Sequence, residues 1–438
     1  MLPPAARSGR LDPDALFFPF AFPPSGTVIA AVSGGGDSSA LLLLLHRHLE
    51  RRFPGTRLLA ATVDHGLREG SATEAAAVAA FAARLGREHR TLPWLGSKPA
   101  TGIQAAARNA RLALLGELAR RETASAIVLG HTQDDQAETV RMRLARGTGR
   151  GLAGMAPATL VDGHAWLLRP LLTTRRATLR AFLSEENVAW SDDPSNEDRR
   201  FERVRVREAG EDAEALGLAH AVAAEREVAG RGAALLMGRS RRIAPGLFRA
   251  EREILDPATP FAPYALRMML AAIGGRAYLP DEAQTAGFID CLRAVGSATL
   301  SGTAATLRRD GLYLHRERRG IVSIRARTGA VFDGRFTVRD SLPGVLTPGD
   351  GEQDFEALAE ESAAPRGLLR AALSTAPFFQ PDPGTSAPEW RDAIVPRVAP
   401  FASLMPVFDH APASAFAQLL GAAPPPAPPY RRPIGGVA

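Results

Sequence analysis

Cysteine and lysine are almost absent from this chain of 438 residues. Cys291 is the single cysteine, which excludes a disulfide framework, a cysteine zinc site and any chemistry that needs two thiols. Lys98 is the single lysine among 53 lysine and arginine residues, so the net charge of +6 is carried by arginine. Arginine favours bidentate contacts with phosphate, so this composition fits a polyanionic partner, and it fits a coding bias toward arginine equally well.

Long apolar runs are also missing. Residues 1–24 contain prolines, arginines and aspartates but no continuous apolar core of the signal-peptide type, and no later run reaches the length of a transmembrane helix. We therefore expect a cytoplasmic protein that has no membrane partner. A hydrophobic content of 45% with 23% charged residues is typical of globular proteins, and the length allows two or three domains.

Apolar strand patterns alternate with helical patterns between residues 27 and 173, which predicts a parallel sheet covered by helices on both faces. The expected strands are Thr27–Val32, Arg57–Val63, Glu88–Trp94, Ala126–Gly130 and Trp166–Leu168. The expected helices are Ser38–Arg51, Ala72–Leu85, Gln104–Glu122, Asp134–Arg146 and Arg175–Glu186. Ligands of such doubly wound sheets bind at the carboxyl ends of the strands, where the strand order reverses.

A glycine-rich turn follows the first expected strand and begins a helix. Its residues are Ser33, Gly34, Gly35, Gly36, Asp37 and Ser38. Backbone N–H groups of such a turn and the positive end of the helix dipole together form an anion site, and glycine lets a phosphate approach the backbone closely. Because the Asp37 carboxylate would repel a bare phosphate, we expect it to hold a Mg²⁺ ion that the phosphates share. The alternative is a plain helix start that Asp37 or Ser38 caps.

An acidic cluster follows the strand Ala126–Gly130, within the segment His131–Thr139. Glu138 follows Asp134 by four residues and Asp135 by three, so the three carboxylates share one face of the expected helix. Acidic residues in a first turn also favour the helix dipole, which is the structural alternative. Because adjacent carboxylates repel one another, we expect a compensating cation, either Mg²⁺ or a substrate ammonium.

Two further segments combine glycine, turn residues and arginine. Arg146–Met155 contains four glycines and suits a mobile loop that closes over phosphates, or a helix C-cap followed by a flexible connection. Trp190–Asn196 forms a polar turn and is followed by the basic stretch Arg199–Arg207, which fits either an RNA backbone contact or a solvated helix face.

Together these segments resemble the PP-loop ATP pyrophosphatases and, among them, the family of bacterial tRNA(Ile)-lysidine synthetases. The resemblance covers roughly residues 25–210 and also includes Val63–Arg68, Ala107-Arg108 with Arg111, and Arg169-Pro170-Leu171-Leu172. It implies the adenine nucleotide hydrolase-like α/β fold. It further implies an ATP-dependent carbon–nitrogen ligase that adenylates the wobble cytidine of a tRNA(Ile) with a CAU anticodon. Free L-lysine then attacks to give lysidine, with AMP and pyrophosphate as the other products.

The resemblance also implies roles for individual residues. The turn Ser33–Ser38 would bind ATP, with Asp37 and Asp134 as ligands of Mg²⁺. Asp135 and Glu138 would bind the lysine ammonium and, with Asp37, form the catalytic group.

Contacts with tRNA or phosphate would fall to Arg146, Arg205 and Arg207. The alternative is another PP-loop enzyme that modifies tRNA or forms an amide. The single cysteine argues against the thiolating members, and no glutaminase domain is visible for the amide-forming ones.

Five regions are expected along the chain. They are an N-terminal extension (1–24), a PP-loop ATP-binding catalytic domain (25–207), a helical tRNA-binding domain (208–298), a small C-terminal α/β region (299–405) and a disordered tail rich in proline and alanine (406–438). The sequence leaves open whether two chains associate as a homodimer, and which residues read the tRNA.

Overall fold

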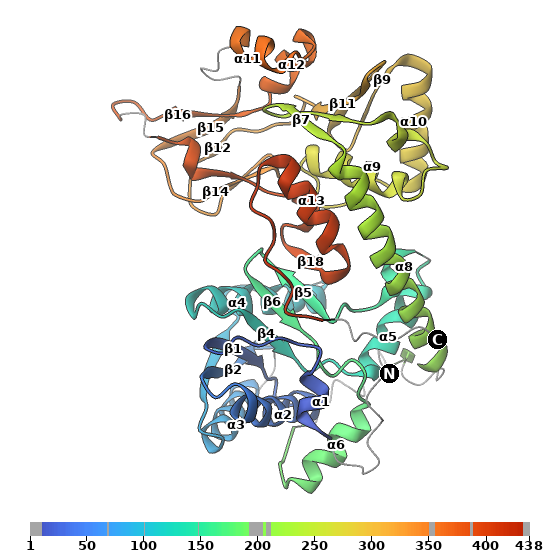
Figure 1. Cartoon of the computed structure of the whole chain (residues 1–438). Coiled ribbons are helices and arrows are strands. Elements are labelled where there is room, and N and C mark those ends of the chain that lie inside the picture. Colours follow the sequence, from blue (N-terminus) through green and yellow to red (C-terminus); the bar gives the residue numbers. More distant parts are fainter. Residues whose placement is uncertain are drawn as a thin grey trace. The chain divides into compact units, whose positions relative to one another are not determined.

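The computed structural model describes residues 11–67, 70–99, 101–147, 149–191, 205–206, 212–349, 355–385 and 389–431. The chain divides into two compact units, residues 1–226 with 426–438 and residues 227–425 (Figure 1). None of the described helices combines the length and the apolar character needed to cross a membrane.

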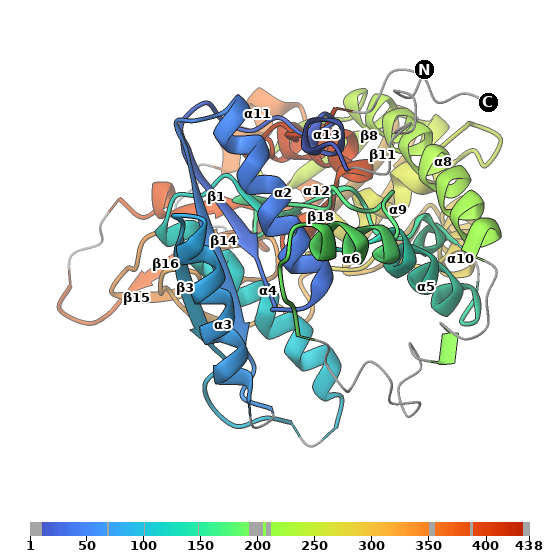
Figure 2. The same cartoon turned by 90° about the horizontal axis from the view of Figure 1, so that it is seen from below.

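The first unit is an α/β structure that begins with the short helix α1. Its helices are α1 (Pro13–Phe17), α2 (Gly36–Arg52), α3 (Ser71–Arg84), α4 (Ile103–Arg121), α5 (Gln133–Leu144) and α6 (Arg176–Glu185). Its strands are β1 (Gly26–Ala31), β2 (Thr56–Asp64), β3 (Glu88–Pro93), β4 (Ala126–Leu129), β5 (Ala158–Val161) and β6 (Ala165–Leu168). Figure 2 shows α2, α3 and α4 running alongside the strands of this sheet.

The strands of the first unit are ordered β5-β6-β4-β1-β2-β3. All neighbours are parallel except β5 and β6, which form an antiparallel pair. The order reverses between β1 and β4, because the chain continues from β1 to β2 on one side and from β4 to β6 on the other. Ala31 at the end of β1 pairs with Leu129 at the end of β4, so the carboxyl ends of the two strands are level. The doubly wound parallel sheet expected from the sequence is confirmed.

Apolar packing explains why these segments form a sheet covered on two faces. Ile29 of β1 and Leu59 of β2 pack against Leu115 and Leu118 of α4 in one buried cluster. The leucine run 41–45 of α2 is buried as well, and α2 contacts β1, β2 and α6. A strand whose two faces are covered reads as a continuous apolar run, as β1 does.

The expected N-terminal extension is part of the first unit. Phe17 of α1 is fully buried and stacks on His48 of α2 with ring centroids 5.1 Å apart. Phe20 forms a β-bridge with Tyr430, so the described end of the chain also belongs to this unit. The disorder expected for residues 406–438 differs from the structure. The described part of this segment contains helix α13 (His410–Leu420), whose Phe416 is fully buried in a hydrophobic cluster of the second unit.

The second unit contains antiparallel sheets and helices. Its main sheet is ordered β7 (Arg241–Ala244), β8 (Leu247–Ala250), β11 (Gly311–Arg316), β10 (Thr303–Arg308) and β9 (Ser297–Leu300). Two small sheets join β12 (Ile324–Arg325), β15 (Gly344–Pro348) and β16 (Pro377–Pro381), and β13 (Val331–Phe332), β14 (Phe336–Val338) and β17 (Ile394–Pro396). The remaining elements are β18 (Leu404–Pro406) and the helices α9 (Ala262–Ile273), α10 (Glu282–Val295), α11 (Phe355–Ser362) and α12 (Arg366–Leu373).

The expected helical domain at 208–298 is helical only in part. Helix α8 (Asp212–Gly238) begins in the first unit and ends in the second, whose boundary lies at residue 227 rather than at 208. The hairpin β7–β8 then interrupts the helical pattern and pairs with the strands that follow residue 298. Strands of four residues are too short to show a two-residue period, and the turn Pro245-Gly246 was the signal that sequence reasoning missed.

Candidate active site

The glycine-rich turn connects β1 to α2 at the point where the strand order reverses. Helix α2 begins at Gly36, with Gly35 as its N-cap and without a side-chain cap, so neither Asp37 nor Ser38 has the capping role that was the alternative. Gly34 has a φ of +92°, a conformation that favours glycine. The Ser38 hydroxyl accepts a hydrogen bond from the Ser33 N–H at 3.1 Å and donates to the Gly35 carbonyl at 3.0 Å. These bonds fix the conformation of the turn. The first N–H groups of a helix have no carbonyl partner within that helix, so those of α2 can bind an anion at the turn.

Neighbouring segments hold the turn from outside. A Cβ atom on Gly36 would lie 3.4 Å from the Trp190 indole, so this ring packs directly on the turn. The Ser191 N–H donates to the Gly34 carbonyl at 3.0 Å. Behind the turn, a Cβ on Gly130 at the end of β4 would lie 3.0 Å from the Asp37 carbonyl oxygen. The conformation of the glycine-rich turn therefore depends on two other segments, at residues 190–191 and at the end of β4.

The acidic helix α5 starts beside this turn, directly after β4. Thr132 is its N-cap and forms a capping box with Asp135. The Asp135 Oδ2 atom accepts hydrogen bonds from the Thr132 N–H at 2.8 Å and from the Thr132 hydroxyl at 2.9 Å. Asp135 thus has the structural role that the sequence offered as an alternative, and its Oδ1 atom still faces the cluster.

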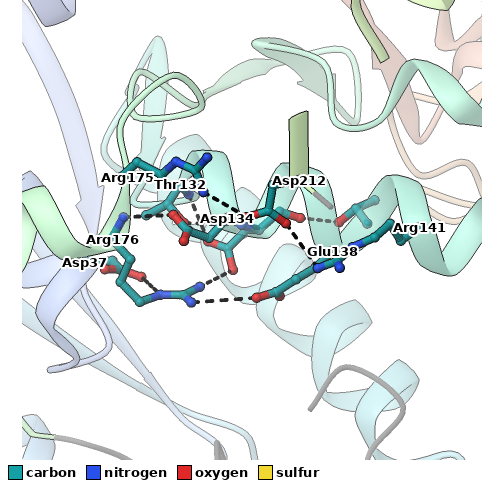
Figure 3. A network of polar contacts seen from close by, with 10 residues as sticks. Asp37, Thr132, Asp134, Glu138, Arg141, Arg175, Arg176 and Asp212 are labelled. Atoms are coloured by element: carbon teal, nitrogen blue, oxygen red, sulfur yellow. Dashed lines mark hydrogen bonds and ion pairs between the residues drawn. The ribbon is translucent and has the colours of Figure 1, made fainter. Parts of the chain in front are cut away.

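Arg176, the first residue of α6, joins the acidic helix to the glycine turn (Figure 3). Its Nε atom lies 3.1 Å from Asp37 Oδ2, its Nη2 atom 3.0 Å from Asp135 Oδ1, and its Nη1 atom 3.6 Å from Glu138 Oε1. Its backbone N–H donates to Asp134 Oδ2 at 2.8 Å. Arg176 therefore brings together all four carboxylates expected at the site, three through its guanidinium and Asp134 through its backbone N–H.

Arg176 is a site residue that sequence reasoning missed, since the compensating cation was expected to be a metal or a substrate. One signal was present in the sequence. Arg175 and Arg176 stand at the N-terminus of a helix, where the dipole disfavours positive charge and acidic partners are needed. Arg175 finds such a partner in Asp212, whose Oδ2 atom lies 2.8 Å from its Nη1 atom.

Burial and neighbouring charges shift the pKa values of this cluster in opposite directions. Burial raises the pKa of the Asp37 carboxyl, and the neighbouring Arg176 offsets this only in part. Burial lowers the pKa of Arg176, but the carboxylates of Asp135, Asp37 and Glu138 outweigh burial and raise it, so the guanidinium stays charged. The Oδ1 atom of Asp37 is buried, and the described residues provide it with no hydrogen-bond partner. Asp37 therefore keeps one buried oxygen that is available to a further partner.

A second group of charges lies near the cluster and is purely basic. Arg169 is buried, and its Nη1 atom donates to the Ala156 carbonyl at 2.6 Å. Burial lowers the pKa of Arg169 to about 9, and repulsion from Arg108, Arg111 and Arg143 adds to this effect. Arg111 also feels the charge of Asp135, so the basic group adjoins the acidic one.

The arginines predicted to contact tRNA or phosphate are only partly covered by the described residues. Arg146 and Arg205 are exposed, and Arg207 lies outside the described residues. Their contacts with tRNA or phosphate stay predictions.

Comparison with known proteins shows which family the chain belongs to. Residues 16–210 match the model of a PP-loop domain family. The chain is 47% identical over 435 residues to the tRNA(Ile)-lysidine synthase of Mesorhizobium japonicum, with 93% of this chain and 94% of that protein covered. The chain belongs to the tRNA(Ile)-lysidine synthase family. The enzyme of the same name from Rhizobium meliloti is 37% identical, with 92% of this chain and 93% of that protein covered. The one from Ruegeria pomeroyi is 39% identical over 66% of this chain and 72% of its own length.

Membership in the tRNA(Ile)-lysidine synthase family confirms two predictions from the sequence, the PP-loop fold and an enzyme that forms a carbon–nitrogen bond. The similarity extends through both units, since the first two relatives cover more than nine tenths of the chain.

Proposed function

We propose that this protein joins free L-lysine to the wobble cytidine of a tRNA(Ile) with a CAU anticodon, in an ATP-dependent reaction that takes place in the cytoplasm. The observation that carries the proposal is the direct link between the phosphate turn and the acidic cluster, from Asp37 through Arg176 to Asp135 and Glu138. A site of this kind brings ATP and a cationic substrate together. The names of the relatives supply the tRNA and the product.

The first step uses the glycine turn. The cytosine carbonyl oxygen attacks the α-phosphorus of ATP, and pyrophosphate leaves. The backbone of Gly34–Ser38 is suited to hold the pyrophosphate part, because a helix N-terminus with little side-chain cover donates N–H groups to anions. Catalysis in such a step is mainly positioning and charge neutralisation.

The residues of this turn also fit a magnesium ion shared with the phosphates. Asp37 offers the buried Oδ1 atom described above, and Asp134 stands on the facing helix α5. One or two carboxylates together with substrate phosphates are the usual protein environment of Mg²⁺. The ion would neutralise the charge that develops on the phosphates. Among the described residues, no cluster of three or more acidic, histidine or cysteine side chains could hold a metal by itself.

The second step uses the acidic face of α5. The ε-amino group of lysine attacks the activated ring carbon, AMP leaves, and the amine loses a proton. Asp135 and Glu138 are the partners proposed for the lysine ammonium group, because they lie three residues apart on one face of α5 and both contact Arg176 beside the turn. One of them can accept the proton before attack.

Binding of tRNA is assigned to arginines. Arg146, Arg205 and Arg207 stay the candidates for the contacts with the RNA backbone, and the basic group around Arg169 and Arg111 adds charge next to the acidic helix. Phosphate contacts of this kind position an RNA without reading its sequence.

One incubation tests the proposal. The protein is mixed with the CAU-anticodon tRNA, Mg²⁺, ATP and labelled lysine, and label in the tRNA is measured together with pyrophosphate and AMP. We expect equal amounts of the three products. Absence of label, with ATP cleaved instead in the presence of ammonia or a thiol donor, would assign the chain to a different reaction of the PP-loop enzymes.

A further inference from the structure

Arg176 occupies the position where the proposed lysine substrate needs to place its ammonium group. The contacts of this side chain reach Asp37 on α2 and both Asp135 and Glu138 on α5 (Figure 3). The side chains of Asp135 and Glu138 are 11% and 2% exposed. A cation that arrives from solvent therefore meets these carboxylates already covered and already paired.

Both carboxylate oxygens of Asp135 already have partners within the protein. Its Oδ2 atom accepts two hydrogen bonds from Thr132, and its Oδ1 atom is the one that Arg176 contacts at 3.0 Å. An ammonium group that approaches Oδ1 is repelled by the positive guanidinium already there, so it binds most favourably when the guanidinium moves away. The lysine subsite is thus closed by a residue of the protein itself.

The guanidinium has a second destination close by. Its Nε atom already contacts Asp37, a residue of the first turn of α2, so it stands next to the proposed phosphate cradle. Phosphate oxygens bind the planar guanidinium fork bidentately, and such charge-assisted bonds are stronger than ordinary ones. Bound ATP therefore competes with the carboxylates for this side chain.

We propose that Arg176 is a positioning residue that closes the lysine subsite in the absence of nucleotide and opens it when the guanidinium turns to the phosphates of bound ATP. This inference rests on the function proposed above. The exchange conserves charge at the buried carboxylates, because one cation leaves and one ammonium arrives. In the state with nucleotide alone, the two buried carboxylates lack this cation, and this unfavourable state drives the binding of the lysine ammonium. The arrangement makes nucleotide bind before lysine.

The consequence is a measurable coupling between two ligands. Typical coupling between two sites changes affinity by about 5- to 150-fold. We expect lysine to bind the full-length protein more tightly by a factor in this range when Mg²⁺ and an ATP analogue with a methylene bridge between the α- and β-phosphates are present. Isothermal titration with lysine, with and without the analogue, measures the factor.

Variants at position 176 separate this role from a structural one. In Arg176→Ala, lysine should bind equally well with and without the analogue. In steady state the Michaelis constant for lysine should fall while that for ATP rises, whereas simple loss of structure would raise both. Arg176→Lys keeps the charge but not the planar fork, so it should retain the fold and only part of the coupling. Arg175→Ala is the matched control, since that guanidinium pairs with Asp212, and its coupling should equal that of the wild type.

Two results would overturn the proposal. Wild-type protein that binds lysine with the same affinity with and without the analogue refutes it, and this outcome does not depend on whether Arg176→Ala folds. Coupling that survives unchanged in both variants at position 176 refutes it as well. Failure of the proposed function is distinguishable, because in that case the wild type would transfer no labelled lysine to tRNA.

Discussion

Replacing Gly130 by alanine tests how tightly the phosphate turn is packed against the end of β4. A Cβ at this position would lie 3.0 Å from the Asp37 carbonyl oxygen and 3.1 Å from both the Asp37 carbonyl carbon and Ser38 Cα. The Gly130 backbone is not in the left-handed region, so alanine brings no conformational strain of its own. The three atoms are backbone atoms of the first turn of α2 and cannot rotate out of the way.

The size of the effect follows from these distances. Carbon atoms in good contact lie about 3.5–4.0 Å apart, so the start of α2 has to move by roughly 0.4 Å or more. Insertion of one methyl group into a packed site destabilises by about 1–3 kcal/mol. A misplacement of 1 Å can lower a rate about 100-fold, so we expect roughly a ten-fold loss of pyrophosphate release and a higher Michaelis constant for ATP.

Gly217→Ala is the matched control for Gly130→Ala. Gly217 lies within α8, and among the described residues nothing comes within 4 Å of a Cβ placed there. Alanine at this site should stabilise the helix by about 1 kcal/mol and leave activity unchanged. Thermal unfolding and the release of pyrophosphate with tRNA, ATP and lysine are measured for both variants. If Gly130→Ala kept the wild-type melting temperature and the wild-type constant for ATP, the packing argument would be refuted.

Three further predictions concern single side chains. Burial raises the pKa of Asp37 above the usual 3.8, so its contribution to stability is favourable below that pH and is lost as the pH rises through the higher pKa of the folded protein. Asp37→Asn should therefore raise the melting temperature at pH 7.5 but not at pH 3. The same variant should lower pyrophosphate release at pH 7.5 about 100-fold or more. Thr132→Val removes the N-cap hydroxyl bonded to Asp135 and should destabilise by about 0.5–2 kcal/mol in urea unfolding, with weaker lysine binding; unchanged stability would contradict the capping box. Asp333→Ala leaves the buried Arg316 without its carboxylate, 2.8 Å away, and should destabilise by about 3–5 kcal/mol, while affinity for the ATP analogue measured under folding conditions stays at the wild-type value.

Local patterns in the sequence predicted most of the first unit correctly. The expected strands and helices between residues 27 and 186 match β1–β4, β6 and α2–α6 to within two residues at each end. Continuous apolar runs and helical periods are properties of short segments, so they can be recognised without the rest of the chain. Strand β5, which has only four residues and pairs antiparallel at the side of the sheet, was missed.

The second unit and the tail were predicted less well for a physical reason. The hairpin β7–β8 is stabilised by pairing with β11, which lies more than sixty residues further along the chain. The alanine- and proline-rich composition of α13 suggested disorder. The structure has a helix there, and its Phe416 packs into the hydrophobic cluster around α9. Partners so distant in sequence leave no signal in a local pattern.

The sequence by itself determined the chemistry available at the site. A glycine turn after one strand and an acidic helix after another place a phosphate site beside carboxylates, because both segments follow neighbouring parallel strands. Only the tertiary structure decided which cation those carboxylates hold. Arg176 lies 139 residues from Asp37 and 41 from Asp135 in the chain, and it reaches both because α6 packs against α2 with its first residue at the switch point of the sheet. Attraction between a half-buried guanidinium and several carboxylates acts through space, so folding had to bring them together before their pairing could be seen.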